Sequence, residues 1–362
     1  MELKKTPLYD EHIKLGGKVV DYAGWALPVQ YVGIMKEHKA VRSKAGIFDV
    51  THMGEIIVKG KEALEYLQHI FTNDLSKLKK QQIMYTFMCY PDGGVVDDLL
   101  VYKIDEDEYM LVPNAANTDK DFKWMIDNKE GYNIILENVS EKIGEVALQG
   151  PLAEKILSEL TEEDLSEIRP FYFKKDILVA DTECLVSRTG YTGEDGFEIY
   201  TSLEGIKKVW NSILEVGEKY GVAPAGLGCR DTLRFEAGLP LYGHEISETI
   251  SPLEGDQKFF VKLDKEDFIG KEALVKQNEN LKRKVVGFEL KGRGVPREEY
   301  EVYKNGNKIG HVTTGYFSPT LKKNIGMALI DSSEAKLGNE IEILIRKKPV
   351  KAEIINKRFY KR

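Results

Sequence analysis

The pattern of apolar residues changes near residue 280, and this change constrains the fold more than any other feature of the sequence. Before it, stretches with helical spacing, such as KEALEYLQHIF at residues 61–71, alternate with stretches of strand-forming residues. After it come short strand-forming runs divided by turn residues, and Asn305-Gly306 between two of them is a strong hairpin signal. The sequence therefore predicts a mixed α/β body followed by a small β-barrel or sandwich.

The α/β body passes twice through a similar order of elements. The first round has predicted strands at residues 84–89 and 95–102 and a helix at residues 117–128. The second has a strand at residues 146–148 and a helix at residues 203–220. Further elements are predicted in the same way: helices at residues 34–43 and 151–160, and strands at residues 177–180 and 183–187. Two rounds of this kind indicate two α/β lobes.

Composition excludes several classes of protein. The chain has 362 residues, enough for two or three domains. Its net charge of −7 argues against a general nucleic-acid binder. Its three cysteines are far apart and odd in number, which argues against a disulfide framework, fits a reducing compartment and offers no metal-ligand spacing. No apolar run resembles a signal peptide or reaches the roughly 20 residues of a membrane span. We expect no membrane association, and a cytoplasmic protein or, if a presequence is missing, one of the mitochondrial matrix.

The segment PDGGVVDDLLVYK, residues 91–103, begins as a turn and continues as a strand. Asp97 and Asp98 stand in the middle of that strand, although Asp is a poor strand residue and burying an unpaired charge is costly. Consecutive strand residues point to opposite faces of a sheet. Asp97 therefore shares its face with Val95, Leu99 and Val101.

A second polar, glycine-bearing segment is SRTGYTGEDGFEIY, residues 187–200. Glu198 lies between Phe197 and Ile199 and faces away from both if this stretch is a strand. It is either an exposed carboxylate on a half-buried strand or a recognition carboxylate. In the second case it would accept two parallel N–H bonds from an amino-pyrimidinone edge such as that of a pterin.

The third segment is AGLGCRDTLRFEAGLPLYGHEI, residues 225–246, which is predicted to open a helix. Arg230 and Arg234 are four residues apart and share a helix face. They form either a solvated basic face with an intrahelical ion pair to Asp231 or a fork that holds a carbonyl or carboxylate group.

These segments, with many others, resemble the glycine cleavage system T proteins, the aminomethyltransferase family. The matches run in order nearly from end to end, and they include TPLYDEH, VDYAGWALPVQY, AGIFDVTHMGE, FTNDL, GGVVDDLLVYK, NAANTDKDF, SRTGYTGEDGFEIY, AGLGCRDTLRFEAGLPLYGHE, DFIGKEAL and GYFSPTLKKNIGMALI. A run of matches in this order is far more specific than any single motif.

The resemblance implies a fold and a division of the chain. The fold class is mixed α/β (α+β), a cloverleaf of two α/β lobes and a small carboxy-terminal β-barrel with a folate channel at the centre. Residues 1–50 with about 140–250 would form the first lobe, and about 51–139 the second. Residues 251–280 would connect the lobes to a barrel of residues 281–362.

The resemblance also implies two acidic site residues. Asp97 matches the family's catalytic aspartate, so its face would look into the folate channel, where it would stabilise positive charge or accept a proton. Asp98 would face the other way and have a structural partner, such as an Arg or backbone amides. Glu198 matches the pterin-binding glutamate.

The remaining implied site residues are an arginine, two tyrosines and an asparagine. Arg230 matches a substrate-contacting arginine, and Tyr191 an aromatic residue beside the folate. Tyr85 and Asn114 fall in segments that line the family's cavity. For the tyrosines, core packing with a satisfied hydroxyl is the alternative.

The implied reaction transfers the methylene of an aminomethyl group on the lipoyl arm of the H protein to tetrahydrofolate. The products are 5,10-methylenetetrahydrofolate, ammonia and dihydrolipoyl H protein, as in glycine catabolism. Tetrahydrofolate is the co-substrate, and no metal is implied. The implied partners are lipoylated H protein and, functionally, the P and L proteins, with no nucleic acid and no membrane; we expect a monomer or weak dimer.

Two other functions fit this fold. One is a folate-dependent demethylase-type enzyme, but the chain lacks a GxGxxG dinucleotide fingerprint after its first strand. The other is a non-enzymatic folate-binding iron–sulfur maturation factor, but the matching region, RFEAGLPLYGHEI, has no cysteine. One departure from the family pattern is the run GDQKFF at residues 255–260, where an apolar stretch is usual.

Overall fold

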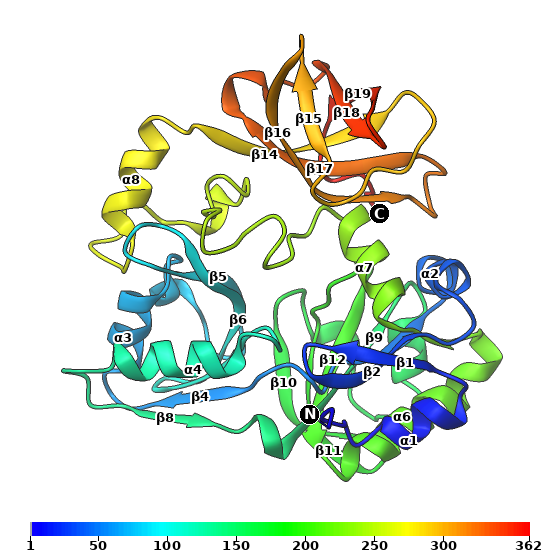
Figure 1. The fold of residues 1–362 in the computed structure, drawn as a ribbon. Helices are drawn as coiled ribbons and strands as arrows, with labels where there is room; N and C mark the ends of the chain where they lie inside the picture. The colour runs from blue at the N-terminus through cyan, green and yellow to red at the C-terminus, as the bar shows by residue number, and fades with distance from the viewer. Residues whose placement is uncertain (1) are drawn as a thin grey trace.

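Two open sheets and one closed barrel organise the chain in the computed structural model, which describes residues 2–362 (Figure 1). Each has an apolar core of its own, and the three lie around the centre of the molecule. The predicted fold class, mixed α/β with a carboxy-terminal barrel, is confirmed.

The first lobe contains a six-stranded sheet in the order β10-β11-β12-β9-β3-β13. Its strands are β3 (Gly46–Asp49), β9 (Ile143–Gln149), β10 (Phe173–Val179), β11 (Thr182–Ser187), β12 (Gly196–Ser202) and β13 (Ala223–Pro224). Helices α5 (Ala153–Leu157) and α6 (Gly205–Gly217) pack on one face and bury Trp210, Phe197 and Ile199. Glu198 lies on the opposite face of β12, so the sheet separates its carboxylate from this core.

The second lobe contains a five-stranded sheet in the order β5-β6-β7-β4-β8. Its strands are β4 (Ile56–Lys59), β5 (Ile83–Cys89), β6 (Val95–Asp105), β7 (Glu108–Val112) and β8 (Ile135–Asn138). Helices α3 (Ala63–Ile70) and α4 (Thr118–Asp127) cover one face, where Tyr66 and Met125 pack against Leu99 and Val101 of β6. Apolar residues at helical spacing on α3 and on alternate positions of β6 make this core.

The two lobes are joined along their sheets. Backbone hydrogen bonds run from Ile83 N to Phe171 O (2.8 Å) and from Phe173 N to Gln81 O (3.0 Å). A shared apolar cluster includes Tyr102 of the second lobe and Phe173 and Tyr200 of the first. The lobes therefore hold one another in register.

The barrel closes in the order β14-β17-β16-β15-β18-β19. Its strands are β14 (Arg283–Leu290), β15 (Glu301–Lys304), β16 (Asn307–Phe317), β17 (Asn324–Asp331), β18 (Glu340–Ile345) and β19 (Lys348–Ile355). Asn305 and Gly306 both have positive φ and connect β15 to β16, as a two-residue hairpin turn requires.

Helix α7 (Leu227–Glu236) lies between the first lobe and the barrel, beside α2 (Ile34–Ser43) (Figure 1). After it, residues 238–270 pass between the barrel and the second lobe and lead to α8 (Lys271–Glu279). Near the amino terminus, α1 (Tyr9–Lys14) precedes a hairpin of β1 (Lys18–Tyr22) and β2 (Trp25–Gln30).

Candidate active site

Strand β6 carries the two adjacent aspartates, and a bulge lies next to them. Met88 of β5 pairs with Asp97, but Cys89 pairs with Val95, so Val96 is an extra residue in β6. The bulge moves Val95 to the apolar cluster under residues 246–253, while Val96 joins the core beneath α3 and α4.

Asp97 points into the second lobe and away from the centre of the molecule. Its side chain is fully buried on the face that it shares with Leu99 and Val101, and that face packs against α3 and α4. Its oxygens accept hydrogen bonds from Asn114 N (2.9 Å), Asn114 Nδ2 (2.9 Å) and Asn117 Nδ2 (2.6 Å). The face that was predicted to look into the folate channel is covered by α3 and α4.

Asp98 lies on the opposite face of β6, which turns toward the first lobe. Its Oδ2 accepts a hydrogen bond from Tyr85 Oη (2.7 Å), and its Oδ1 accepts one from Asn114 Nδ2 (3.0 Å). Its hydrogen-bond partners are thus a tyrosine and an asparagine side chain, and not the expected Arg or backbone amides. Burial raises the pKa of Tyr191 in the first lobe, and the charge of Asp98 adds to that rise.

Both aspartates are harder to ionise than an ordinary Asp side chain. Burial, followed by the charge of Asp97, raises the pKa of Asp98 to about 7, although the hydrogen bonds from Tyr85 and Asn114 oppose that rise. Burial also raises the pKa of Asp97, against the hydrogen bonds that it accepts. Asp98 therefore changes its charge near neutral pH and sits where the two lobes meet.

Glu198 supplies a second carboxylate from the first lobe. It is 7% exposed and points away from Phe197 and Ile199. Its Oε2 accepts a hydrogen bond from Thr189 Oγ1 (2.5 Å), and its other oxygen accepts none from residues 2–362. Burial raises the pKa of Glu198, while Thr189 and the charge of Arg230 act in the opposite direction.

Arg230 lies near Glu198 with its guanidinium group unpaired by any residue within 2–362. Its Cζ lies 4.9 Å from the centre of the Tyr191 ring, which is a cation–π contact. The Tyr191 hydroxyl donates to the carbonyl oxygen of Pro240. The first lobe thus brings together three groups that a ligand could use: the buried Glu198 carboxylate with one free oxygen, the unpaired Arg230 guanidinium and the Tyr191 ring.

Arg234 has a structural position, so the two arginines of α7 do not form a fork. Its side chain is 1% exposed and pairs with Asp231 (2.7 Å) and Glu245 (2.9 Å), and it donates to Thr314 of the barrel (3.2 Å). Arg234 therefore ties α7 to the barrel, and Arg230 alone is available to a ligand.

Sequence reasoning missed a line of buried hydroxyl groups that joins Glu198 to β6. Tyr102 Oη lies 2.9 Å from Tyr200 Oη and 3.2 Å from Ser187 Oγ, and Ser187 Oγ lies 2.6 Å from Thr189 Oγ1. Thr189 then donates to Glu198. Only the hydroxyl groups within SRTGYTGEDGFEIY hinted at this network in the sequence.

The run GDQKFF places an aromatic residue against the site. The Phe260 ring contacts the Tyr85 ring edge to face, with 4.8 Å between the ring centres. Phe259 beside it is 77% exposed. Lys357 Nζ holds the start of the run through the carbonyl oxygens of Gly255 (2.9 Å) and Asp256 (3.2 Å).

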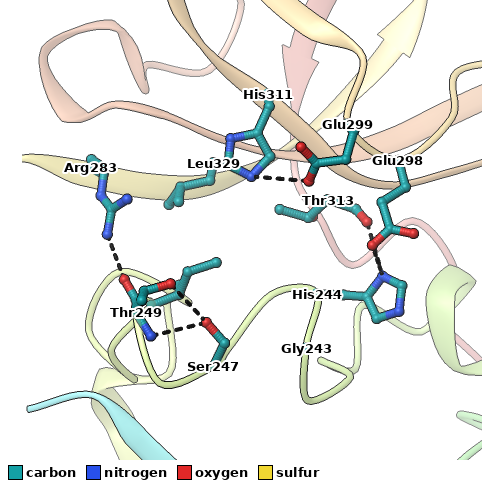
Figure 2. A pocket seen from close by; sticks show the side chains of 11 residues that line it. Gly243, His244, Ser247, Thr249, Arg283, Glu298, Glu299, His311, Thr313 and Leu329 are labelled. Carbon is teal, nitrogen blue, oxygen red and sulfur yellow. Dashed lines mark hydrogen bonds and ion pairs between the residues drawn. The ribbon is translucent and has the colours of Figure 1, made fainter.

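A hollow of about 170 Å³ lies apart from these residues, between the barrel and the loop after α7 (Figure 2). His244 contacts Glu298 (3.2 Å) and the carbonyl oxygen of Thr313 (3.1 Å) there. Arg283 at its edge pairs with Glu254 (2.8 Å). These polar groups are already partnered, so we assign no ligand to this hollow.

Residues 2–362 contain neither a candidate metal cluster nor a helix that could span a membrane. No group of three or more His, Cys, Asp or Glu side chains is placed to hold a metal ion. No helix has the length and apolar character to cross a bilayer.

Comparison with known families matches both parts of the chain. The model of the GCVT N-terminal domain matches residues 8–265, and the model of the glycine cleavage T-protein C-terminal barrel domain matches residues 283–361. The fold defines a two-lobed protein with an appended barrel, and the chain belongs to the glycine cleavage T-protein family.

Individual relatives are similar over their whole length. A protein named aminomethyltransferase from Thermoanaerobacter pseudethanolicus is 63% identical over 361 residues, which is 99% of this chain and 98% of the relative. Another from Alkaliphilus oremlandii is 60% identical over 362 residues, covering 100% and 98%. The crystal structure of glycine cleavage system aminomethyltransferase T from Bartonella henselae superposes with a TM-score of 0.92 at 31% identity, covering 99% of this chain and 98% of that one.

Proposed function

We propose that this chain transfers the methylene of the aminomethyl group on the lipoyl arm of H protein to tetrahydrofolate. The chain is an enzyme of the aminomethyltransferase class, as are the full-length relatives by name. The observation that carries the proposal is the meeting of Asp98 and Tyr85 from one lobe with Tyr191, Arg230 and Glu198 from the other.

Glu198 and Arg230 are the groups that would hold the folate. The free oxygen of Glu198 and its partner oxygen present two parallel acceptors to the N–H groups of a pterin edge. Thr189 fixes the orientation of that carboxylate. Arg230 presents unpaired N–H donors to a carbonyl or carboxylate, and Tyr191 offers an aromatic face beside it.

Asp98, and not Asp97, is the carboxylate that we propose acts on the reacting carbon. Positive charge develops on that carbon when it separates from nitrogen or sulfur, and a fixed carboxylate in a protected site stabilises such charge strongly. Tyr85 and Asn114 hold the two oxygens of Asp98. Asp97, which is buried beneath α4, instead holds Asn114 in place through two hydrogen bonds.

The bonds and protons of the reaction balance without any redox change. The carbon exchanges its bonds to sulfur and nitrogen for two bonds to folate amines. The two protons lost by those amines end on the lipoyl sulfur and on ammonia. An ionised Asp98 near the carbon would stabilise its positive charge or relay one of these protons.

We further propose that H protein, with its lipoyl arm, is the macromolecular substrate, and that the P and L proteins act with it in sequence. We also propose that the protein is a monomer or weak dimer and that it is cytoplasmic. The strong similarity to named aminomethyltransferases supports the partner.

The experiment that tests the function is tetrahydrofolate-dependent ammonia release from aminomethylated H protein. We expect ammonia and 5,10-methylenetetrahydrofolate in equal amounts, and no release when folate is omitted. Folate binding without release would favour the non-enzymatic folate-binding factor. Release of formaldehyde equivalents from N-methyl substrates, with H protein inert, would favour the demethylase-type enzyme.

A further inference from the structure

We propose that Asp121 is a neutral carboxylic acid that shares its proton with Asp97, and that this pair fixes Asn114 and thereby the orientation of Asp98. Asp121 lies on α4, one turn after Asn117, whose Nδ2 donates to Asp97 on the buried face of β6. The inference rests on the proposed function only in the part that concerns Asp98.

The burial of Asp121 requires a proton or a partner. Its side chain is 0% exposed, and neither of its oxygens accepts a hydrogen bond from any N–H or O–H group of residues 2–362. An ionised carboxylate without a partner is strongly disfavoured in such a place. Asp97 is within hydrogen-bonding reach of Asp121, and two carboxylates so close together cannot both stay ionised.

The geometry indicates which of the two carries the proton. Asp97 accepts three N–H bonds, from Asn114 N, Asn114 Nδ2 and Asn117 Nδ2. Hydrogen bonds of this kind favour the ionised form of the group that accepts them. Asp121 accepts none, so the proton belongs on Asp121, which then donates it to Asp97. Burial, together with the charge of Asp97, correspondingly raises the pKa of Asp121 to about 11.

The nearby cation does not replace this proton. Lys120 is adjacent on α4, but its Nζ is directed to the carbonyl oxygen of Val96 (2.6 Å) and to Tyr242 Oη (3.0 Å). Its charge lowers the pKa of Asp121 less than burial and Asp97 raise it.

The other titratable groups around the pair are tyrosines and an aspartate. Tyr90 and Tyr242 lie close enough to Asp121 to interact with it electrostatically, and Tyr85 lies close enough to Asp97. Asp98 adds a further negative charge that raises the pKa of Asp121. None of these groups supplies a positive charge that would ionise Asp121.

Asn114 transmits the arrangement to the site. Its Nδ2 lies 2.9 Å from Asp97 Oδ1 and 3.0 Å from both the Oδ1 and the carbonyl oxygen of Asp98. Two N–H groups thus serve three acceptors, and the position of Asp97 decides how they are divided. Asp121 is therefore a positioning residue, which acts on Asp98 through Asp97 and Asn114.

An infrared measurement tests the proton without reference to activity. The difference spectrum between wild type and Asp121→Asn at neutral pH should contain the carbonyl band of a protonated buried carboxylic acid, present in wild type and absent in the variant. Asp119→Asn, an exposed position on the same helix, is the matched control and should leave the band unchanged. No such band in wild type, or a band that persists in Asp121→Asn, would overturn the proposal.

Kinetics with aminomethylated H protein test the positioning role. Asp121→Asn keeps an N–H donor toward Asp97, so kcat should stay within about threefold and the acid limb of kcat/KM should not move. Asp121→Ala removes the donor, and kcat should fall about tenfold with the KM for folate nearly unchanged. If the acid limb of Asp121→Asn moved to lower pH, Asp121 would be ionised in wild type and the proposal wrong. Absence of any turnover with an intact infrared band would count against the proposed function alone.

Discussion

Asp97 and Asp98 are neighbours in the sequence, yet the two faces of β6 give them different chemistry. Asp97 is held by three N–H groups beneath α4, and Asp98 faces a tyrosine and the opposite lobe. The three donors around Asp97 favour its ionised form against the effect of burial, whereas burial and the charge of Asp97 raise the pKa of Asp98 to about 7. The fully buried Asp97 with its three donors therefore suits a structural role, and the less buried Asp98 at the meeting of the lobes suits the proposed catalytic one.

Asp98→Asn should have the largest effect on kcat. Loss of the charge should lower kcat on the order of a hundredfold or more, because the carboxylate acts on charge that develops during transfer. Folate binding by calorimetry should change little. Initial rates with saturating H protein measure the loss, and a near-normal Asp98→Asn enzyme would break the comparison.

Glu198→Gln comes next, because it tests the carboxylate on the other lobe. The change keeps the size of the side chain but replaces one acceptor with a donor that faces pterin N–H groups. A mispaired buried site costs roughly 1–3 kcal/mol, so folate affinity should fall about tenfold or more. Calorimetry with tetrahydrofolate measures this, and unchanged affinity would return Glu198 to the role of a half-buried strand carboxylate.

Tyr85→Phe sharpens the comparison by removing one of the two donors to Asp98. That hydrogen bond lowers the pKa of Asp98, so its loss should move the acid limb of kcat/KM to higher pH by about one unit. Activity at neutral pH should fall severalfold and recover at higher pH. A uniform loss at all pH values would mean that the hydroxyl does not tune Asp98.

The smallest expected effect is on the KM for H protein, and it comes from charged side chains near the carboxy terminus. Exposed and tied-down side chains should again behave differently there. The sequence RKKPVKAEIINKRFYKR, residues 346–362, is strongly basic, which suggests attraction of anionic visitors such as the folate tail and H protein. Arg358 and Lys361 are exposed, whereas Lys357 is tied to residues 255–256.

Charge reversal of Arg358 and Lys361 together should raise the KM for H protein about two- to threefold at low salt, with kcat nearly intact and the effect shrinking as salt rises. Lys357→Glu should instead lower the melting temperature, because it places a carboxylate beside two carbonyl oxygens and Asp256. An unchanged KM at low salt would leave Arg358 and Lys361 without a role in association.

Much of the fold could be predicted from local pattern. The helix predicted at residues 34–43 is α2 (Ile34–Ser43), and the Asn305-Gly306 turn connects β15 to β16. The helix predicted at residues 151–160 is only α5 (Ala153–Leu157), and no element was predicted for β8 (Ile135–Asn138). Short elements of this kind depend on tertiary partners that a local pattern does not contain.

The site was harder to predict, for a physical reason. Alternation along β6 correctly groups Asp97 with Leu99 and Val101, but it does not say which face α3 and α4 cover. A signal was available, because Leu99 and Val101 are the aliphatic residues of a core face. The pairing of β5 with β6 puts Tyr85 on the same face as Asp98, so a polar side chain on that face was a second signal.

Contacts between distant segments were beyond the sequence. Arg234 shares a helix face with Arg230, yet it is held by Glu245 and by Thr314, which is 80 residues away in the chain. Asp121 gave no signal at all, since an acidic residue early in a helix is ordinary helix chemistry. Only the packing of α4 on β6 reveals that it is buried beside Asp97.

The pH dependence of kcat/KM in wild type and Asp97→Asn tests the central claim most directly. Asp98 must be ionised to act, and its pKa is about 7, so kcat/KM should rise as the pH increases through 7 in wild type. The charge of Asp97 adds to the effect of burial on that pKa, so Asp97→Asn should move the acid limb to lower pH, and its plateau kcat should fall less than that of Asp98→Asn. An acid limb that stays in place, or an Asp97→Asn enzyme that loses turnover at every pH while Asp98→Asn retains it, would contradict the assignment of Asp98 as the working carboxylate.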